Sequence, residues 1–558
     1  MSNSMYTVIR KHALKNALDH GKAILKAVMP KVIGEVPEAK DDIKGLVKKI
    51  KEVLEEVNKL GEKEILKELK SLAPELLVEE EEEQGLPDLK VKGKPVFRLA
   101  PFPSGAIHLG NTRGMIINDE YAKKYDGKLL LVIDDTIGSK AKPIVKEAYK
   151  LIPEALKWLK IKYDETIYKS DRLGLFYKHG RKLIEKDAAY VCECPSELIR
   201  DYRSKGIACT HRKQSVKENL AKWDKMLEGG YEAGGAVVRL KTDIKHKNPA
   251  FRDRVLFRIS ERRHERVGDK YHVWPMLEMS WAVDDMLLGV THIIRGKELM
   301  IEGMMEEFIW DVLGYKDTPE IIHHGLFQVK GAKISKSKAR KEVMSGEYTG
   351  WDDPRTWSVQ SLKRRGFKPE AVREFILLLG LSKSEITVPV NNLYAINRRL
   401  IDSEAMRYFF VKDPVKLVVT DCPEMKVSIP LHHELDKTRS YVVEEGVNEF
   451  WIAGSDVKLI KEEGRVRLKD AMNIELKGVG DVVKAFYSKD QDEVYDIQKV
   501  QFVPKKGRRC QVLMPDGSYD KGLCEDYCKR VKKGDLIQFE RYAFVKKEEA
   551  GKYIYTHN

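Results

Sequence analysis

The chain has 558 residues, which is too long for a single hydrophobic core, so we expect several domains. Charged residues make up 34% of the chain and the formal net charge is +14, which favours a polyanionic partner but does not choose between RNA and DNA. No run approaches the roughly 20 apolar positions of a membrane-spanning helix, and the N-terminus lacks the apolar core and cleavage site of a signal peptide. The seven cysteines, an odd number, do not predict a disulfide framework, so a reducing, cytoplasmic setting is expected.

The N-terminal part of the chain is predicted to form a small helical appendage. Apolar residues recur at helical spacing through residues 1–30 and 41–72, with an interruption from Pro30 to Pro37. The acidic run at residues 79–83 is followed by a glycine and a proline, which indicates an exposed linker. Helical stripes of this kind normally reflect ordinary packing, so we assign no chemistry to this segment.

A stretch that begins at Arg98 and reads RLAPFPSGAIHLGN predicts a strand, a tight turn and a helix. Pro101 and Gly105 punctuate the turn, and an amphipathic run begins near His108. A helix that starts after such a turn points its free backbone N–H groups at an anion, and Gly110 lets a flat ligand approach the backbone. His108 is then placed to donate a hydrogen bond to a phosphate oxygen.

A second stretch, KISKS at residues 333–337, brings two ammonium groups and two hydroxyls into one loop. These groups would clamp a polyphosphate and neutralise the charge that develops on it. Taken alone, the first stretch is most often an ordinary turn and the second a solvated loop. Their occurrence on one chain, in this order, gives them functional meaning.

Together the two stretches resemble the HIGH and KMSKS motifs of class I aminoacyl-tRNA synthetases, written here as HLGN at residues 108–111 and as KISKS. Three flanking segments narrow the resemblance: DDT at 134–136, GVTHIIRG at 289–296 and GWDDPR at 350–355. They look like the glutamyl and glutaminyl group, and most like the archaeal glutamyl-tRNA synthetases. The resemblance extends from about residue 88 to the C-terminus.

This resemblance implies an α/β fold built around a Rossmann-type catalytic domain. The expected division is a helical appendage at 1–86, the catalytic domain at 87–337, a helical connector at 338–410 and anticodon-binding β-barrels at 411–558. Short alternating runs separated by Gly and Asp turns, which dominate from residue 411, are themselves typical of barrels. Residues there of the types that stack on or bond to unpaired bases are Arg508, Arg509, Tyr519, Phe539 and Arg541, and the sequence assigns none of them a role.

The function implied is ATP- and Mg²⁺-dependent activation of L-glutamate and its transfer to tRNA(Glu), with tRNA(Gln) left open as a second acceptor. The catalytic residues would be His108, Lys333 and Lys336. The ATP-binding residues would be Pro101, Gly105, His108, Gly110, Asn111, Ser335 and Lys336. The amino-acid-binding residues would be Arg98, Asp134, Thr136, Leu277, Trp281 and Arg295. Archaeal members of the family carry an N-terminal extension that in some cases docks another protein.

Part of the amino-acid pocket is also predicted from the residues themselves. Asp134 follows an apolar strand at 127–133, and open α/β sheets bind ligands at that edge, where a carboxylate holds an ammonium group. The alternative role for Asp134 is a helix N-cap. Arg98 and Arg295 offer bidentate forks for carboxylates, with structural salt bridges as the alternative. Two arginines and one carboxylate suit a dicarboxylic amino acid.

The same pocket departs from the family pattern at four positions. These are Phe102, Val132, Leu277 and Trp281, where polar or differently sized residues are usual. Apolar replacements remove donors that recognise a carboxylate or an amide. A glutaminyl or altered-specificity synthetase therefore stays open beside the glutamyl enzyme, as does a non-catalytic tRNA-binding paralogue.

An insertion predicted at residues 190–240, which contacts the tRNA acceptor end in the family, carries a candidate metal site. Its ligands would be Cys192, Cys194, Cys209 and His211. Three thiols and an imidazole suit a tetrahedral structural Zn²⁺, which would order a segment with little core of its own. Buried thiols and a surface histidine are the alternative. Strands predicted at 237–240 and 255–259 are expected to return to the catalytic sheet.

Overall fold

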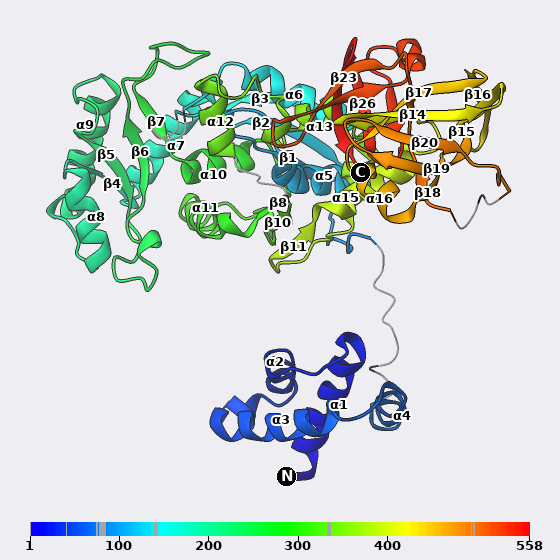
Figure 1. Ribbon diagram of the computed structural model, residues 1–558. Coiled ribbons are helices and arrows are strands. Elements are labelled where there is room, and N and C mark those ends of the chain that lie inside the picture. Colours follow the sequence, from blue (N-terminus) through cyan, green and yellow to red (C-terminus); the bar gives the residue numbers. More distant parts are fainter. Residues whose placement is uncertain are drawn as a thin grey trace. The chain divides into compact units, whose positions relative to one another are not determined.

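The computed structural model divides into two compact units, residues 1–84 and 85–558 (Figure 1). It describes residues 2–40, 42–73, 76, 85–137, 143–331, 336–492, 494 and 497–558. Each unit has a hydrophobic core of its own and is described by itself. Among the described residues, none of the helices combines the length and apolar content needed to cross a bilayer.

The N-terminal unit is a bundle of short helices. They are α1 (Ser2–His20), α2 (Leu25–Glu35), α3 (Ile43–Val57) and α4 (Glu62–Leu72). The apolar stripe of α3 faces the core, and Asp42 caps that helix by accepting a hydrogen bond from the N–H of Gly45 at 2.9 Å. The predicted interruption begins later than expected, because α2 continues through Pro30. Val28 and Val32, which flank that proline in the sequence, are both fully buried in the core of this unit.

The centre of the second unit is a five-stranded, entirely parallel sheet with the order β3-β2-β1-β8-β9. Its strands are β1 (Val96–Leu99), β2 (Lys128–Ile133), β3 (Glu165–Tyr168), β8 (His292–Gly296) and β9 (Glu320–His324). After β1 the chain builds outward through β2 and β3, and it later returns to build on the other side of β1. The order therefore reverses between β1 and β8, and ligands of such sheets bind at the carboxyl ends of the strands at this point.

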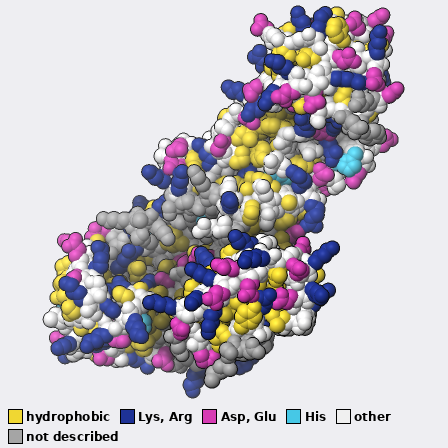
Figure 2. All heavy atoms as spheres, turned by 60° about the horizontal axis from the view of Figure 1, so that its bottom comes forward, with side chains coloured by type: hydrophobic (Ala, Val, Ile, Leu, Met, Phe, Trp, Pro, Cys, Tyr) yellow, Lys and Arg dark blue, Asp and Glu magenta, His cyan; other side chains and the backbone are white. Residues whose placement is uncertain are grey.

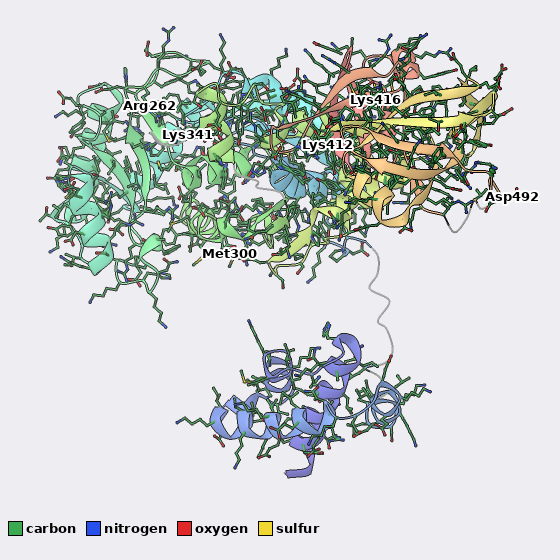
Figure 3. The ribbon with its side chains drawn as sticks, viewed as in Figure 1. Arg262, Met300, Lys341, Lys412, Lys416 and Asp492 are labelled. Carbon is green, nitrogen blue, oxygen red and sulfur yellow. The ribbon has the colours of Figure 1, made fainter. Side chains whose placement is uncertain are left out.

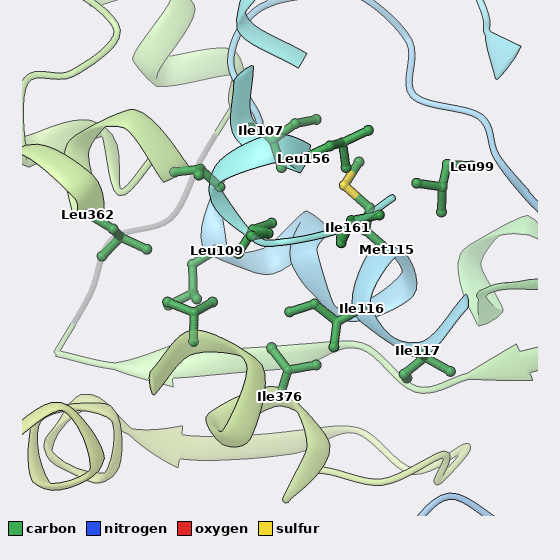
Figure 4. Close-up of a cluster of buried hydrophobic side chains, with 14 of the residues drawn as sticks. Leu99, Ile107, Leu109, Met115, Ile116, Ile117, Leu156, Ile161, Leu362 and Ile376 are labelled. Atoms are coloured by element: carbon green, nitrogen blue, oxygen red, sulfur yellow. The ribbon is translucent and has the colours of Figure 1, made fainter. Parts of the chain in front are cut away.

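Helix α5 (Leu109–Lys124) follows β1 and is buried between the sheet and later helices (Figure 4). The labelled side chains Ile116 and Ile117 of this helix lie among apolar residues such as Leu362 and Ile376, which come from far along the chain. Arg113 on the same helix is fully buried and donates to the carbonyl of Gly325 at 2.6 Å. This helix ties the connector to the sheet, so its N-terminus is rigidly placed.

The remaining helices of this part of the unit surround the sheet and extend into the connector. They are α6 (Ala148–Trp158), α7 (Leu173–Glu185), α10 (Leu277–Leu287), α11 (Met300–Leu313), α12 (Lys336–Met344), α13 (Val359–Arg365), α14 (Pro369–Leu377) and α15 (Val390–Ile401). Strands β10 (Phe327–Lys330) and β11 (Ile386–Pro389) form a small parallel pair that joins the end of the catalytic region to the connector.

A separate antiparallel sheet, with the order β4-β5-β6-β7, occupies one end of this unit (Figure 1). Its elements are β4 (Ala189–Cys192), α8 (Ser196–Lys205), α9 (Val216–Leu227), β5 (Val237–Leu240), β6 (Val255–Ile259) and β7 (Val273–Pro275). The expectation that residues 237–240 and 255–259 rejoin the catalytic sheet was wrong, because these strands pair with β4 and with each other. An apolar run predicts a strand but does not state its partner.

The other end of the unit consists of two seven-stranded sheets, and both close into barrels by the same device. In one sheet the edge strands β12 (Met406–Tyr408) and β13 (Phe410–Lys412) are separated only by Phe409, so one segment forms both edges. In the other, β21 (Lys499–Val500) and β22 (Val503–Pro504) are separated only by Gln501 and Phe502. The rings of Phe409 and Phe502 are buried and lie 5.7 Å apart, so the two closures pack on each other.

The other strands of the two barrels, together with a protruding hairpin and one short helix, complete the chain. They are β14 (Pro414–Cys422), β15 (Met425–His432), β16 (Leu435–Val443), β17 (Gly446–Ala453), α16 (Asp456–Glu463), β18 (Arg465–Leu468), β19 (Met472–Val479), β20 (Val483–Tyr487), β23 (Arg508–Leu513), β24 (Tyr519–Cys524), β25 (Leu536–Phe539), β26 (Ala543–Glu549) and β27 (Lys552–His557). Burial rules out Phe539 as a base-stacking residue. It is fully buried and its ring stacks on Phe410, whereas Tyr519 is half-exposed.

Candidate functional site

A cavity of about 1010 Å³ opens where the parallel sheet reverses its order. It is bounded by the turn after β1, the end of β2, the first turns of α10, the end of β8 and the segment that follows β9. Ten residues predicted from the sequence line it: Arg98, Pro101, His108, Gly110, Asn111, Asp134, Thr136, Leu277, Trp281 and Arg295. The fold therefore gathers the candidate ATP-binding and amino-acid-binding residues around one space.

The HLGN turn is held in place by a distant segment of the chain. His108 is the N-cap residue of α5 and forms an isolated β-bridge with Ser358. On either side of it, the carbonyl of Ile107 accepts from the N–H of Val359 at 2.8 Å, and the N–H of Leu109 donates to Trp357 at 3.0 Å. These bonds fix the start of α5 against the connector, and Gly110 and Asn111 of its first turn line the cavity.

Gly105 is the one predicted ATP-binding residue in the described part of this turn that stands outside the cavity lining. Its φ is +136°, and a Cβ added to it would lie 2.1 Å from the ring of Trp351. The glycine is thus explained by a backbone conformation and a close contact that L side chains do not allow.

The second motif lies only partly within the described residues. Lys333 and Ser335 fall outside them, as does the side chain of Lys336. Helix α12 begins at Lys336, and Arg340, one turn further on, lines the same cavity as His108. The helix that carries the end of the KISKS motif therefore borders the cavity.

The inner end of the cavity is built from three buried ion pairs around one indole ring. Arg98 pairs with Asp285, with Nη2 to Oδ2 at 2.7 Å, and Arg295 pairs with Glu306 at 2.8 and 3.1 Å. Lys169 Nζ lies 3.4 Å from Asp134 Oδ1. The three cations lie within 5.1 to 5.2 Å of the ring centroid of Trp281, which is 5% exposed.

Burial and ion pairing act in opposite directions on the pKa of each of these groups. Burial lowers the pKa of Arg98, but the carboxylate of Asp285 outweighs it, and the pKa is raised overall. Burial raises the pKa of Glu306 to about 7, and Arg295 only partly opposes this. Arg98 therefore stays charged, whereas Glu306 can exchange a proton near neutral pH.

Sequence reasoning placed Arg98, Asp134 and Arg295 at the cavity but missed their partners. Each of the three already has a counter-ion, so the salt-bridge alternative for the two arginines is present alongside their position at the cavity. Lys169 could have been predicted from the sequence, because it follows β3 at the same sheet edge as Asp134. Nothing in the sequence singles out Glu306, because it is one of several carboxylates on helix α11.

The departures from the family pattern have different structural consequences. Phe102, Leu277 and Trp281 line the cavity, whereas Val132 is fully buried within β2 and stands outside the lining among the described residues. Trp281 was predicted to remove a polar contact. Its ring instead serves as a common neighbour of three cations.

The candidate zinc ligands come together at the edge of the antiparallel sheet. The four ligand atoms of Cys192, Cys194, Cys209 and His211 lie within 4.8 Å of one another. Cys192 Sγ is 3.8 Å from Cys209 Sγ, and His211 Nδ1 is 3.4 Å from Cys194 Sγ. Bonds of about 2.3 Å to a tetrahedral zinc ion would separate the ligand atoms by about 3.7 Å, so this donor set fits zinc. Arg239 Nη1 lies 3.7 Å from Cys209 Sγ, where it would favour thiolate.

Comparison with known proteins decides the family. The model of "tRNA synthetases class I (E and Q), catalytic domain" matches residues 95–403, and the corresponding anticodon-binding domain matches residues 405–489. The chain belongs to the class I tRNA synthetases of the glutamyl and glutaminyl group. The predicted family and fold class are confirmed.

Curated relatives of this synthetase group match the chain over nearly its whole length. The glutamate–tRNA ligase of Pyrococcus furiosus is 44% identical over 552 residues, which is 96% of each chain. That of Pyrococcus horikoshii is 45% identical over 557 residues, again 96% of each. A solved glutamate tRNA ligase from Elizabethkingia meningosepticum is 18% identical, with a TM-score of 0.41, and the match covers 56% of this chain and 70% of that one.

Proposed function

We propose that this synthetase is a glutamate–tRNA ligase, which activates L-glutamate with ATP and transfers it to the 3′ end of tRNA(Glu). The observation that carries the proposal is the near-full-length similarity to curated glutamate–tRNA ligases. The cavity supports it, because residues of the HLGN turn, the DDT segment and α12 line a single space. tRNA(Gln) is a second acceptor to be tested.

The chemistry needs no side-chain nucleophile. In the first step the amino-acid carboxylate attacks the α-phosphorus of ATP and pyrophosphate leaves. His108, Lys333 and Lys336 stabilise the charge on the phosphates, and Mg²⁺ would add charge neutralisation when bound. Arg98, Asp134 and Arg295 orient the amino acid. In the second step a terminal ribose hydroxyl of the tRNA attacks the mixed anhydride, and AMP leaves.

The other parts of the chain are assigned to binding. The barrels at 411–558 would read the anticodon, the insertion at 190–240 would contact the acceptor end, and the unit at 1–86 would dock a partner protein. Figure 2 shows Lys and Arg interspersed with Asp and Glu over the face in view, so backbone contacts to tRNA there would be distributed. We propose the cytoplasm as the compartment, because tRNA charging supplies ribosomes and the seven cysteines form no disulfide bond.

We further propose that Cys192, Cys194, Cys209 and His211 hold a structural Zn²⁺. The support is the short spacing of their ligand atoms and the small size of the local apolar cluster, in which only Tyr190 and Ile199 are buried beside the ligands Cys192 and Cys209. The ion would replace a hydrophobic core that this segment does not possess.

A charging assay tests the function directly. The purified protein is incubated with ATP, tRNA and each of the 20 amino acids in turn, and glutamate with tRNA(Glu) is the expected reactive pair. Lys336→Ala should lower kcat by about 100-fold, because the phosphate charge loses a neutralising ammonium group. Lys341→Ala, a change at an exposed lysine of the same helix, is the matched control and should stay within about twofold (Figure 3). Charging of another amino acid would overturn the substrate assignment, and an unaffected Lys336 variant would overturn the phosphate clamp.

A further inference from the structure

The turn that carries His108 is held by a segment whose own backbone is strained. The carbonyl of Trp357 accepts a hydrogen bond from the N–H of Leu109 at 3.0 Å, and Ser358 forms a β-bridge with His108. Trp357 has a φ of +51°, in the left-handed region that bulky side chains seldom adopt. Such a conformation persists only where its surroundings fix it. The contacts of the Trp357 side chain therefore matter for the position of the HLGN turn.

The indole ring of Trp357 lies against a buried arginine. Arg365, on α13, is fully buried, and its guanidinium carbon lies 4.7 Å from the centroid of the Trp357 ring and 5.1 Å from that of Phe367. Among the described residues, no carboxylate forms an ion pair with Arg365. A buried cation without a counter-ion is costly, and an apolar side chain of similar length would pack here without that penalty. The guanidinium therefore calls for a role beyond packing.

The polar edge of the same guanidinium is bonded to strand β27 of a barrel. Arg365 Nη2 donates to the carbonyl of Thr556 at 2.8 Å, and Nε donates to that of Tyr555 at 3.2 Å. The hydroxyl of Thr556 donates in return to the carbonyl of Arg365. Because a guanidinium is planar and its N–H groups have fixed directions, these bonds set the orientation of its face. The barrel strand thus fixes the group whose face contacts Trp357.

We propose that Arg365 is a positioning residue for the ATP-binding turn. Its edge is bonded to β27, and its face contacts the indole of Trp357, whose carbonyl binds the first N–H of α5. The barrel thereby takes part in placing His108 for the phosphates of ATP. The inference rests on the proposed function, in which the HLGN turn binds ATP. The charged residues assigned to the amino acid are held by counter-ions of their own, so the effect should be confined to ATP.

The neighbouring Arg364 provides a matched control. Its Nε and Nη2 bond the carboxylate of Glu548 on β26 at 2.6 and 3.1 Å, so it joins the same helix to the same barrel. It also lies 3.8 Å from the half-exposed Asp352, and a pair of this kind contributes little. Among the described residues, Arg364 makes no cation–π contact with Trp357. A change at Arg364 therefore weakens the attachment of the barrel without removing the contact to the indole.

The test measures steady-state kinetics of tRNA charging by the full-length protein. Arg365→Met removes the charge and the donors, so its KM for ATP should rise by at least about tenfold while KM for glutamate stays within about twofold. Arg365→Lys keeps the charge and a donor but has no flat face, and it should give an intermediate KM for ATP. Arg364→Met should leave both KM values within about twofold. A protein that is merely less stable would lose active molecules, which lowers kcat and leaves the KM for ATP unchanged.

A second measurement reports on the turn itself and needs no catalysis. Amide hydrogen exchange at Leu109 should become faster in Arg365→Met, because the carbonyl of Trp357 is then less firmly placed, and it should stay unchanged in Arg364→Met. If Arg365→Met does not fold, Thr556→Val takes its place. This change keeps the shape of the side chain and removes only the hydroxyl that bonds the carbonyl of Arg365. It should raise KM for ATP by at least about threefold.

A folded Arg365→Met variant in which either the KM for ATP or the exchange at Leu109 is unchanged would overturn the inference. Where that variant does not fold, an unchanged KM for ATP in Thr556→Val has the same meaning. Equal rises in the KM values for ATP and glutamate would also contradict it, because the effect would not then be specific to the turn. Normal glutamate charging by the wild type and by these variants would overturn this inference alone. A wild type that does not charge glutamate would overturn the proposed function, and hydrogen exchange would still test the role of Arg365.

Discussion

At the scale of single residues, the site depends on charges that are buried and paired. Lys169 illustrates this, because it was not part of either motif and yet lies between Asp134, the hydroxyl of Ser280 and the ring of Trp281. A buried charge that loses its partner is costly, whereas an exposed pair contributes little. Residues outside the sequence motifs can therefore determine whether the motif residues keep their positions in the site.

Replacing Lys169 with Met should destabilise the protein by about 3–5 kcal/mol, because Asp134 stays buried without its cation. KM for glutamate should rise at least about tenfold while KM for ATP stays within about twofold, since Asp134 is assigned to the amino-acid ammonium. Lys123→Met is the control, because it removes a half-exposed partner of the buried Asp119, which stays paired with Arg373. Adding Asp134→Asn should recover stability but not KM. Melting temperatures and steady-state kinetics report both effects, and equal changes in the two KM values would contradict the assignment.

At the scale of elements, segments with a small hydrophobic core are stabilised by other contacts: candidate metal ligands, barrel closure and a buried ion pair. The apolar cluster around Cys192 has only four buried residues, and two of them, Cys192 and Cys209, are candidate zinc ligands. The barrels are instead closed by single segments, whose rings at Phe409 and Phe502 lie 5.7 Å apart. A buried pair, Arg439 and Glu525, joins the β15–β16 hairpin to one of the barrels.

Cys209→Ser should reduce the zinc content from one ion per chain to well below half, because three ligands bind zinc far more weakly than four. Amide hydrogen exchange should rise across residues 190–213 and stay unchanged in the parallel sheet. Cys422→Ser, a buried thiol in a barrel, is the control and should leave the metal content unaltered. A wild-type protein that contains no zinc by elemental analysis would contradict the metal site.

The Arg439–Glu525 pair makes the barrels sensitive to pH. Burial raises the pKa of Glu525 to about 7 from an ordinary value of 4.5. A raised pKa in an acid means that its stabilising contribution is present at low pH and is lost as the pH rises through about 7, a change of about 3 kcal/mol. The melting temperature of the wild type relative to Glu525→Gln should therefore fall between pH 5 and pH 8. A constant difference would show that Glu525 does not titrate in this range.

At the scale of the whole molecule, the chain consists of two compact units, and the cavity belongs to one of them. Every residue that lines the cavity falls between Arg98 and Arg340, within the second unit. The N-terminal unit has its own core, in which sixteen residues are buried, and it contributes none of the described lining.

Removal of residues 1–84 should therefore leave glutamate charging intact. We expect kcat and KM for ATP and glutamate to stay within about twofold of the full chain, because the cavity keeps all of its lining residues. The measurement is tRNA charging by the two proteins side by side, with the melting temperature as a check of folding. A loss of more than about tenfold in kcat/KM for glutamate would show that the first unit takes part in the site.

Local patterns in the sequence were sufficient for much of this protein. The turn before α5, the apolar strand β2, the stripe of α3 and the spacing of the cysteine and histidine ligands are each encoded within one continuous segment of the chain. The requirements of such features are local, since helix periodicity, turn residues and ligand types are visible without knowing the rest of the fold.

Tertiary structure alone decided which distant groups meet. It placed β5 and β6 in a separate sheet, buried Phe539, and supplied Asp285, Glu306 and Lys169 as counter-ions of residues that the sequence had placed at the cavity. The sequence marks a residue that needs a partner, such as a buried arginine, but the partner is chosen by packing between segments, which for Arg98 and Asp285 lie 187 residues apart. The pairing of charges at the amino-acid end is a property of that packing, and so only the folded chain determines it.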